Sequence, residues 1–257
     1  MKIISLLENT TNKNLKTEHG LSLYVEALDR KILFDFGSTD LFLQNAKKLG
    51  VDLREVDFAV LSHGHNDHGG GIKAFLDINK HAPIYVNPNA TSPHYNKAGE
   101  YIGLDLDLIK EKRLIFVEKQ ENIHTGLTVF NCNNNAIFTP IVSNGHTKEE
   151  NGVRVEEDYN HEQYLLINEN GNRVLLSGCS HKGITNIMEW IKPTHLIGGF
   201  HYSKLPLDNA LIDCAAKLNE YDTEYYTCHC TGVDRFEYMK MHMKALHYLA
   251  CGDEIVI

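Results

Sequence analysis

The sequence contains no long hydrophobic run, no excess of positive charge and no paired cysteine pattern, and each absence argues against a class of protein. No apolar segment approaches the roughly 20 residues that a membrane-spanning helix requires. The formal net charge of −9 argues against duplex nucleic acid as the main partner, because phosphate binding needs a basic surface. A small anionic substrate is compatible with this charge, since bound metal ions can reverse the sign of a pocket locally.

The amino-terminal segment MKIISLLENTTNKNL lacks the long apolar core and the small-residue cleavage site of a secretory signal. The six cysteines are scattered without framework spacing, which indicates reduced thiols rather than disulfides. We therefore expect a cytoplasmic protein. With 257 residues, 42% of them hydrophobic and 23% charged, the chain has a globular composition and can bury a sizeable core.

Short strand patterns alternate with helical patterns along the whole chain, and no linker or low-complexity segment divides them. Strands outnumber helices and come before helices in both halves, which is typical of two packed sheets with helices outside. We therefore expect one domain over residues 1–257. Helical spacing predicts helices at residues 40–50, 68–78, 183–191, 207–221 and 234–249. Residues 88–112 and 144–160 are candidate lids, and the second is polar enough to be expected as a mobile loop.

The segment VLSHGHNDHGGG at residues 60–71 places His63, His65, Asp67 and His68 where an apolar strand ends and a glycine-rich turn begins. Imidazole and carboxylate together suit zinc, iron or manganese, whereas a structural zinc clip would more often use paired cysteines. Four ligands from so short a segment cannot easily reach one ion. The constraint disappears if His63 and His65 bind one ion while Asp67 and His68 bind a second. The two ions would then lie roughly 3.5–4 Å apart, as in hydrolytic centres.

The motif SHGHNDH matches the H-x-H-x-D-H pattern of the metallo-β-lactamase superfamily, and ILFDFG resembles the aspartate-bearing strand end that precedes it. The segments EHGLSLYV, GCSHKGI, GGFH and HCTG resemble a branch of methanopterin-pathway proteins, the dihydropterin ribofuranosyl-aminobenzene phosphate synthase-like group. The resemblance covers nearly the whole chain. It implies an α/β protein with a four-layer αββα sandwich, in which two mixed β-sheets hold the metals between their edges and the helices lie outside.

The same resemblance implies one later histidine for each metal. For the first metal we favour His161, which stands just before a strand, over His146 in the acidic loop. For the second metal both His229 and His201 stand at late strand ends, and spacing alone cannot choose between them. We favour His229 and expect His201 to support a ligand or to contact the substrate.

The bridging aspartate that the family pattern implies is replaced here by the turn Cys179-Ser180-His181. His181 is favoured as the ligand because imidazole binds metal without a depressed thiol pKa, and Cys179 is the alternative. Adjacent residues in a turn seldom orient as nucleophile and base, so a covalent mechanism through this turn is disfavoured. Asp35 is expected to accept a hydrogen bond from a ligating histidine, and His19 is a weaker candidate to face the same pocket.

A metal-bound water has a pKa near 7, so the sequence predicts hydrolysis of an ester, thioester, lactone or phosphoester, with Asp67 as proton acceptor. The predicted cofactor is two divalent metal ions, with zinc favoured and iron or manganese as alternatives. The expected substrate is a small molecule, and anionic or phosphorylated compounds are among the candidates. Neither nucleic acid nor membrane is expected as a partner, and the sequence leaves the oligomeric state open.

Two other functions stay open from the sequence. The resemblance to the methanopterin branch implies a synthase that transfers a pterin, in which the metals hold a phosphate rather than deliver water. Cys179, Cys228 and Cys230 lie near candidate ligands and motivate a metal or redox sensor without catalysis. A C-x-C pattern alone is a weak signal, because buried inert thiols are common.

Overall fold

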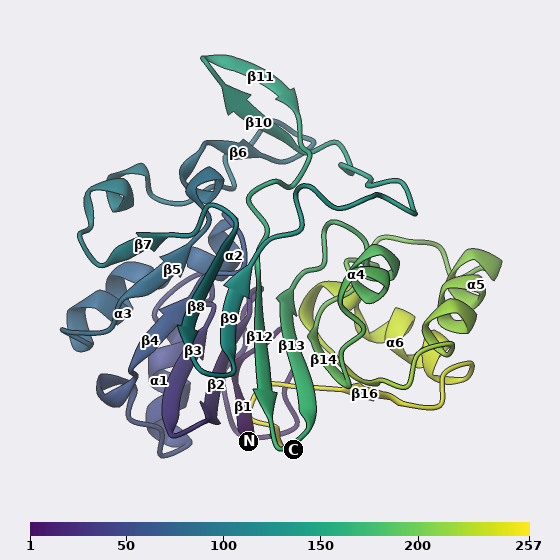
Figure 1. The fold of residues 1–257 in the computed structure, drawn as a ribbon. Helices are drawn as coiled ribbons and strands as arrows, with labels where there is room; N and C mark the ends of the chain where they lie inside the picture. Colours follow the sequence, from purple (N-terminus) through teal and green to yellow (C-terminus); the bar gives the residue numbers. More distant parts are fainter.

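Two seven-stranded mixed β-sheets form the centre of the computed structural model, which describes residues 1–257 (Figure 1). The first sheet has the order β17-β1-β2-β3-β4-β5-β7 and comprises Glu254–Val256, Lys2–Leu7, Ser22–Ala27, Arg30–Phe34, Phe58–Val60, Ile84–Val86 and Leu114–Phe116. The second has the order β16-β15-β14-β13-β12-β9-β8 and comprises Leu246–Tyr248, Glu224–Thr227, His195–Gly198, Asn172–Gly178, Tyr164–Glu169, Leu127–Phe130 and Gln120–His124. A three-stranded sheet of β11 (Val153–Glu156), β10 (Thr147–Glu150) and β6 (His94–Tyr95) lies at one end.

Helices cover the outer face of each large sheet. The helices are α1 (Leu41–Lys48), α2 (Asn66–Gly69), α3 (Ile72–Ile78), α4 (Ile184–Ile191), α5 (Asn209–Leu218) and α6 (Val233–Lys240), with short 3₁₀ turns at Leu53–Glu55, Pro88–Thr91, Leu106–Lys110 and His229–Thr231. Helices α1 and α3 lie against the first sheet, whereas α4, α5 and α6 lie against the second. The predicted four-layer αββα arrangement is therefore confirmed.

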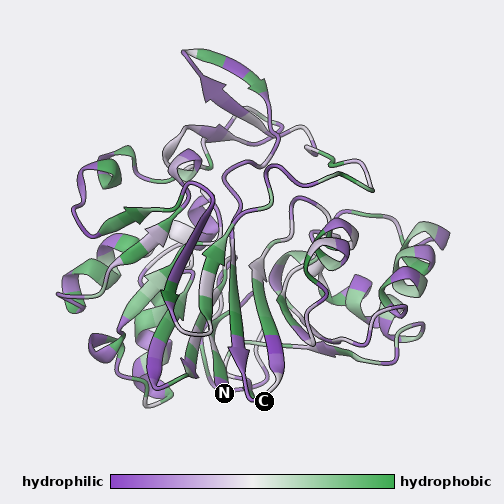
Figure 2. Ribbon diagram, in the orientation of Figure 1, coloured by the Kyte–Doolittle hydropathy of each residue, from purple (hydrophilic) through white to green (hydrophobic).

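Three hydrophobic clusters fill the spaces between these layers, and Figure 2 shows hydrophobic residues concentrated in the strands. On β3, Ile32 and Phe34 face the second sheet, whereas Leu33 faces α1 and α3. All three side chains are fully buried because both faces of this strand are covered. Its continuous apolar run is therefore a consequence of the four-layer fold.

Each strand that precedes one of these predicted site residues pairs in parallel with at least one neighbour. In the first sheet β3, β4, β5 and β7 pair in parallel, and in the second β13, β14, β15 and β16 do so. Asp35 follows β3, His63 follows β4 after two residues, Cys179 follows β13 and His229 follows β15 after one residue. Since the carboxyl ends of parallel strands meet at one edge of a sheet, these residues are delivered to a common region.

The predicted helix over residues 234–249 is wrong in its second half. Helix α6 ends at Lys240, and Leu246–Tyr248 instead form β16, which pairs in parallel with β15. This pairing gives hydrogen-bond partners to the backbone N–H and C=O groups along the edge of β15. It also places Leu246 in the core beneath the helices. The predicted helix over residues 68–78 is also divided, because α2 and α3 are separated at Gly70 and Gly71.

Residues 144–160, expected as a mobile loop, form mainly a β-hairpin. Strand β10 pairs with β11 from Thr147 opposite Glu156 to Glu150 opposite Val153, and it pairs with β6 on its other side. Lys148 lies 2.7 Å from the carboxylates of both Glu150 and Asp158. The expectation failed because these polar residues pair across the hairpin instead of entering a core. None of the helices combines the length and apolar composition that a membrane crossing requires.

Candidate metal centre

The turn after β4 carries the predicted metal ligands into the interior. His63, His65 and His68 are buried, and the side chain of Asp67 is 18% exposed. The short helix α2 begins after His65 and positions Asp67 and His68 on its single turn. Buried imidazoles and a carboxylate are costly unless each is paired or binds metal. The contacts of each imidazole nitrogen therefore indicate whether the turn can bind a metal.

The imidazoles of His63 and His68 are oriented by Asp35 from the end of β3. Asp35 Oδ2 lies 2.7 Å from His68 Nδ1 and accepts a hydrogen bond from Ser62 Oγ, also at 2.7 Å. Ser62 Oγ in turn lies 2.8 Å from His63 Nδ1. Because Ser62 gives its proton to Asp35, it accepts the Nδ1–H of His63. Both rings therefore present Nε2, the nitrogen without a proton in the neutral form, to the cavity.

His229 is oriented in the same way from the other sheet. Its Nδ1 lies 2.8 Å from Asn9 Oδ1, which accepts the Nδ1–H of the neutral ring. Its backbone N–H donates to Glu8 Oε1 at 2.6 Å. The Nε2 atom of His229 therefore points inward, 3.2 Å from Asp67 Oδ2 and 3.2 Å from His68 Nε2.

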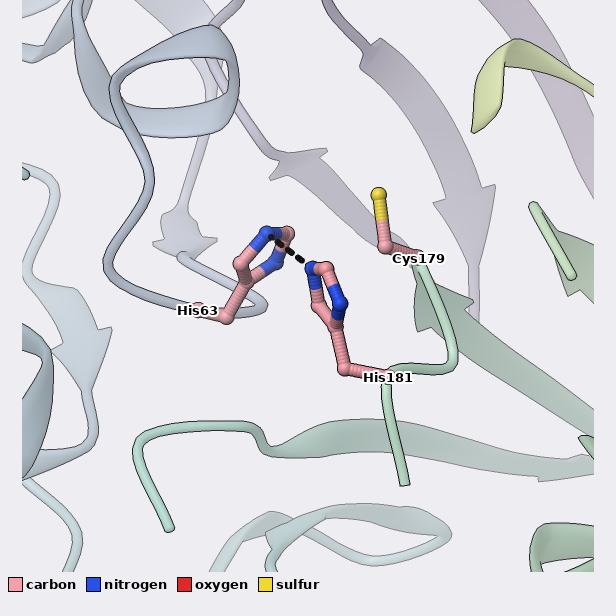
Figure 3. Close-up of side chains that lie close together, drawn as sticks. All are labelled: His63, Cys179 and His181. Carbon is pink, nitrogen blue, oxygen red and sulfur yellow. Dashed lines mark hydrogen bonds between the residues drawn. The ribbon is translucent and has the colours of Figure 1, made fainter. Parts of the chain in front are cut away.

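Imidazole nitrogens face one another in two pairs across this region. His63 Nε2 lies 3.2 Å from His181 Nε2, and Figure 3 shows these rings approaching from the loops after β4 and β13. The second pair is His68 with His229. Two nitrogens bound to one zinc at about 2.0–2.1 Å in tetrahedral geometry lie about 3.3 Å apart. The spacing of both pairs therefore fits ligands of a common ion.

Cys179 lies between the two pairs. Its Sγ atom is 3.1 Å from His68 Nε2. The ligand atoms of Cys179, His63 and His181 lie within 4.8 Å of one another, and the same holds for Cys179, His68 and His229. Burial raises the pKa of Cys179 well above its ordinary value, so without a metal the group is a thiol. Its position is that of a side chain able to reach both sites.

His161 lies in a neighbouring cluster with His65 and His94. The Nδ1 atom of His161 accepts a hydrogen bond from the backbone N–H of Gly64 at 2.8 Å, so its neutral ring carries the proton on Nε2. That Nε2 lies 3.6 Å from Glu157 Oε1. His94 Nδ1 lies 2.7 Å from Glu157 Oε2. His65 Nε2 is buried without a hydrogen-bond partner and is free to bind a metal.

His201, His146 and His19 lie around the two pairs. The ring of His201 is 4.2 Å from that of His181, and His146 lies between His201 and His65 at 6.2 and 5.6 Å. His19 Nε2 lies 3.1 Å from Asp67 Oδ2, and its side chain is 70% exposed. The structure thus brings all the predicted site residues into one neighbourhood, with His161 beside His94, and His19 at the surface.

The electrostatics of the cluster differ between its members. Burial and the neighbouring histidines lower the pKa of His63, His65 and His181 well below the ordinary value. Burial alone would lower the pKa of His68 too, but the carboxylates of Asp35 and Asp67 raise it to about 9. Metal binding at His68 must therefore displace a proton.

The cluster opens into a cavity of about 240 Å³ lined by residues of both sheets. Its lining comprises His19, His65, Asn66, Asp67, Asn96, Ile102, His146, Cys179, His181, His201, Ser203, Lys204, His229 and Cys230. Three larger surface hollows, of about 430, 530 and 390 Å³, are lined by none of the predicted site residues. The chemistry of the lining, rather than its size, makes the 240 Å³ cavity the candidate site; we call it the histidine cavity.

Four residues around the candidate metal centre have a strained backbone conformation. Asp35, Ser180, His201 and His229 adopt φ values of 61°, 57°, 57° and 48°, in the left-handed region that side chains other than glycine seldom occupy. Such residues cost on the order of 1–3 kcal/mol each and persist where the surroundings require them. All four follow closely after a strand end, and three carry predicted metal-site side chains.

The supporting residues carry little signal in the sequence. Glu8 and Asn9 hold His229, Glu162 accepts the backbone N–H of His181 at 2.6 Å, and Glu157 contacts two histidines. Ser62 links His63 to Asp35. Each lies beside a strand end or a motif histidine, which is the one feature that could have indicated it. Their partners are distant in the chain, so only the fold reveals them.

The chain belongs to the metallo-beta-lactamase superfamily, whose family model matches residues 16–221. The fold agrees with this membership. A crystal structure of Tm1679, described as a metal-dependent hydrolase of the beta-lactamase superfamily, superposes with a TM-score of 0.87 at 28% identity, covering 100% of this chain and 99% of that one. Members of this superfamily are generally metal-dependent hydrolases.

Two relatives come from Methanocaldococcus jannaschii. One is named 7,8-dihydropterin-6-methyl-4-(beta-D-ribofuranosyl)-aminobenzene-5'-phosphate synthase; it is 30% identical over 273 residues, covering 90% of this chain and 88% of its own length. The other, an uncharacterized protein named MJ0448, is 28% identical over 240 residues, covering 88% of this chain and 89% of its own. The predicted resemblance to this branch is confirmed.

Proposed function

We propose that this protein is a metal-dependent hydrolase with two divalent metal ions, preferably zinc, in the histidine cavity. The observation that carries the proposal is the pair of 3.2 Å Nε2–Nε2 separations, His63 with His181 and His68 with His229. In each pair the spacing suits one tetrahedral ion, and three of the four rings have their outer nitrogen engaged by another residue. Such engagement is typical of ligating histidines.

The proposed ligands of the first ion are His63, His65 and His181. Asp67, His68 and His229 would hold the second ion, and Cys179 lies close enough to both sets of ligands to contribute to either. His161 then acts by holding the turn rather than by binding metal, because its Nδ1 accepts from Gly64. In this proposal His181, rather than His161, is the later histidine that binds the first ion.

Two such ions, when bound, supply Lewis acidity and lower the pKa of a coordinated water toward about 7. Asp67 accepts the proton released on attack, using the oxygen that does not face His229. His19 approaches the other oxygen, Asp67 Oδ2, at 3.1 Å, so this mostly exposed ring holds the carboxylate in position.

His201 is the proposed donor to the developing oxyanion. Burial lowers its pKa to about 4, so the ring is neutral at pH 7. Its Nδ1 lies 3.3 Å from the amide nitrogen of Asn144, which donates to it, so the proton of His201 resides on Nε2. A neutral imidazole N–H that lines the cavity can stabilise negative charge without a proton transfer.

The proposal is tested by metal analysis together with a substrate panel. Protein purified in zinc is expected to contain about two zinc ions per chain and to hydrolyse at least one ester, thioester, lactone or phosphoester. His63→Ala should abolish turnover and lower the zinc content, whereas His124→Ala, at an exposed histidine in the second sheet, should change neither. Full activity of chelated, metal-free protein would refute the proposal.

A second candidate function is a synthase of the methanopterin type, favoured by the 30% identical relative over 90% of this chain. In that case the ions held by the same ligands would bind a phosphate group while a pterin is transferred to the ribofuranosyl-aminobenzene phosphate and diphosphate leaves. Incubating the zinc-loaded protein with a pterin diphosphate and a ribofuranosyl-aminobenzene phosphate separates the two functions. A condensed product supports the synthase, and hydrolysis without condensation supports the hydrolase.

A further inference from the structure

A second cavity opens directly beside the histidine cavity. It has a volume of about 190 Å³ and shares two lining residues, His181 and His201, with its neighbour. Its other lining residues are Thr139, Pro140, Ile141, Val142, Asn144, Ser180, Gly183, Thr185, Phe200, Tyr202 and Leu205. We call it the lateral compartment. A molecule whose reacting group lies in the histidine cavity can therefore extend past His181 and His201 into this space.

The lateral compartment differs from the histidine cavity in chemistry. It contains no carboxylate and no lysine or arginine, and Pro140, Ile141, Val142, Phe200 and Leu205 give it an apolar wall. Val142 and Leu205 are 62% and 38% exposed, so this apolar surface faces water. Exposed apolar side chains that line one concave surface are typical of a binding site.

The wall that carries Pro140, Ile141 and Val142 is held in place by helix α4. The side chain of Asn186 accepts the backbone N–H groups of Phe138 and Thr139 at 3.0 and 2.8 Å and donates to the carbonyl of Thr139 at 2.7 Å. Trp190 Nε1 donates to the carbonyl of Ala136 at 2.8 Å. Figure 2 shows hydrophobic residues along this loop, which follows β9. The wall is thus built before any ligand arrives, which lowers the entropy cost of binding.

We propose that the lateral compartment binds an apolar group of the substrate, a short acyl chain, while the polar end occupies the histidine cavity. This inference rests on the proposed hydrolase function, and it names the substrate class as amphiphilic. Lys204 lines the histidine cavity and forms no ion pair with an acidic residue, so its ammonium group is available to a polar end that is anionic or becomes so on hydrolysis.

The test measures binding of straight-chain carboxylates to the zinc-loaded, full-length protein by calorimetry. Acetate, butanoate, hexanoate and octanoate serve as mimics of a hydrolysis product. Each methylene that leaves water should lower Kd about fourfold, until the compartment is filled and further carbons add little. A Kd that does not change between acetate and hexanoate overturns the proposal.

Two variants and one matched control locate the chain. Leu205→Asn and Val142→Asn should each weaken hexanoate binding about tenfold and leave acetate binding within about twofold. Leu207→Asn is the control, because Leu207 is 48% exposed in the same loop as Leu205 but does not line the compartment. All three positions are partly exposed, so folding is not expected to suffer. Equal effects of the Leu205 and Leu207 variants on hexanoate would overturn the assignment.

The outcome is separable from that of the proposed function, because binding requires no turnover. A chain-length series with the expected slope, in a zinc-loaded protein that hydrolyses nothing, would refute the hydrolase and support an amphiphile-binding compartment. Turnover of esters with no dependence on acyl length would support the hydrolase and overturn the compartment.

Discussion

The backbone N–H of Gly64 donates a hydrogen bond to Nδ1 of His161 at 2.8 Å. Gly64 stands between His63 and His65, so this contact fixes the segment that presents two of the proposed metal ligands. A Cβ at Gly64 would lie 2.4 Å from the carbonyl oxygen of Ala90, so the turn also depends on the close approach of another backbone. His161 therefore positions ligands through the main chain.

Replacing His161 distinguishes positioning from ligation. His161→Ala removes the acceptor of the Gly64 N–H, and we expect the affinity for zinc to fall about 10–100-fold, as it does when ligand-orienting residues are lost. The number of zinc ions bound at saturation should stay the same. His161→Gln, whose side-chain oxygen can accept the same hydrogen bond, should recover part of the affinity. Loss of one zinc ion per chain at saturating metal in both variants would show that His161 is a ligand.

Asp35 provides a second test of the supporting residues. Its carboxylate is fully buried and accepts hydrogen bonds from Ser62 N, at 2.7 Å, and Ser62 Oγ, and it contacts His68 Nδ1. Asp35→Asn replaces one acceptor oxygen with an amide group that donates toward other donors, and it removes the charge that orients His68. We expect a loss in zinc affinity of about 10–100-fold, measured by competition with a chelating dye. Asp77→Asn, at an exposed aspartate of α3, is the control and should bind zinc like the unchanged protein.

The fold and the first metal motif could be predicted from the sequence because both are local patterns. The apolar run at Phe58–Val60 and the dense cluster after it need no knowledge of distant residues. Which later histidine approaches His63 could not be predicted: the sequence favoured His161 over His146 for the first metal and His181 over Cys179 in the turn after residue 178, and His161 and His181 both stand beside a strand end. It depends on which ring reaches His63 across the gap between the sheets, and the structure brings His181 there.

The prediction of one helix over residues 234–249, which α6 and β16 occupy, failed for a similar reason. The stripe of Met239, Met243 and Leu246 fits a helix, and all three residues do lie in one core cluster. The chain nevertheless becomes extended at Leu246–Tyr248, because β15 offers an unpaired edge there. The periodic spacing of apolar residues indicates which side chains are buried, but pairing with the neighbouring strand determines the backbone conformation.

Cys179 is the residue at which this chain departs from the family pattern, and its substitution tests the shared position. Cys179→Ala removes a side chain that reaches both pairs of imidazoles. We expect the zinc content to fall from about two ions toward one per chain, as measured by elemental analysis. Cys179→Asp restores a harder oxygen ligand and should increase the binding of manganese relative to zinc.

The control for this pair is Cys214→Ser on α5, where the hydroxyl can keep the hydrogen bond to Tyr202. It should leave both the zinc content and the metal preference unchanged. If Cys179→Ala also binds two zinc ions with unchanged affinity, the thiol takes no part in metal binding.

The metal-free protein should be most stable near pH 6.5. Four buried imidazoles have a folded-state pKa well below the ordinary 6.5, namely His63, His65, His161 and His181. The pKa of His229 is also lowered, and that of His201 falls to about 4, so these two rings act in the same direction. Below pH 6.5 these imidazoles bind protons in the unfolded chain but stay neutral in the folded chain, so acidification favours unfolding. Each such group therefore removes up to about 1.4 kcal/mol from the free energy of unfolding per pH unit of acidification.

His68 acts in the opposite direction and limits stability on the alkaline side. Its pKa is raised to about 9, so its contribution is fully present below pH 6.5 and is lost as the pH rises through 9. Urea unfolding of chelated protein at pH 5.5, 6.5 and 8, followed by the fluorescence of Trp190, should give the highest free energy at 6.5 and a steeper fall toward acid, because the groups with a lowered pKa outweigh the one with a raised pKa. His161→Gln removes one group with a lowered pKa and should flatten the acid limb. Equal free energies at pH 5.5 and 6.5 would contradict the burial of neutral imidazoles on which the proposed metal centre depends.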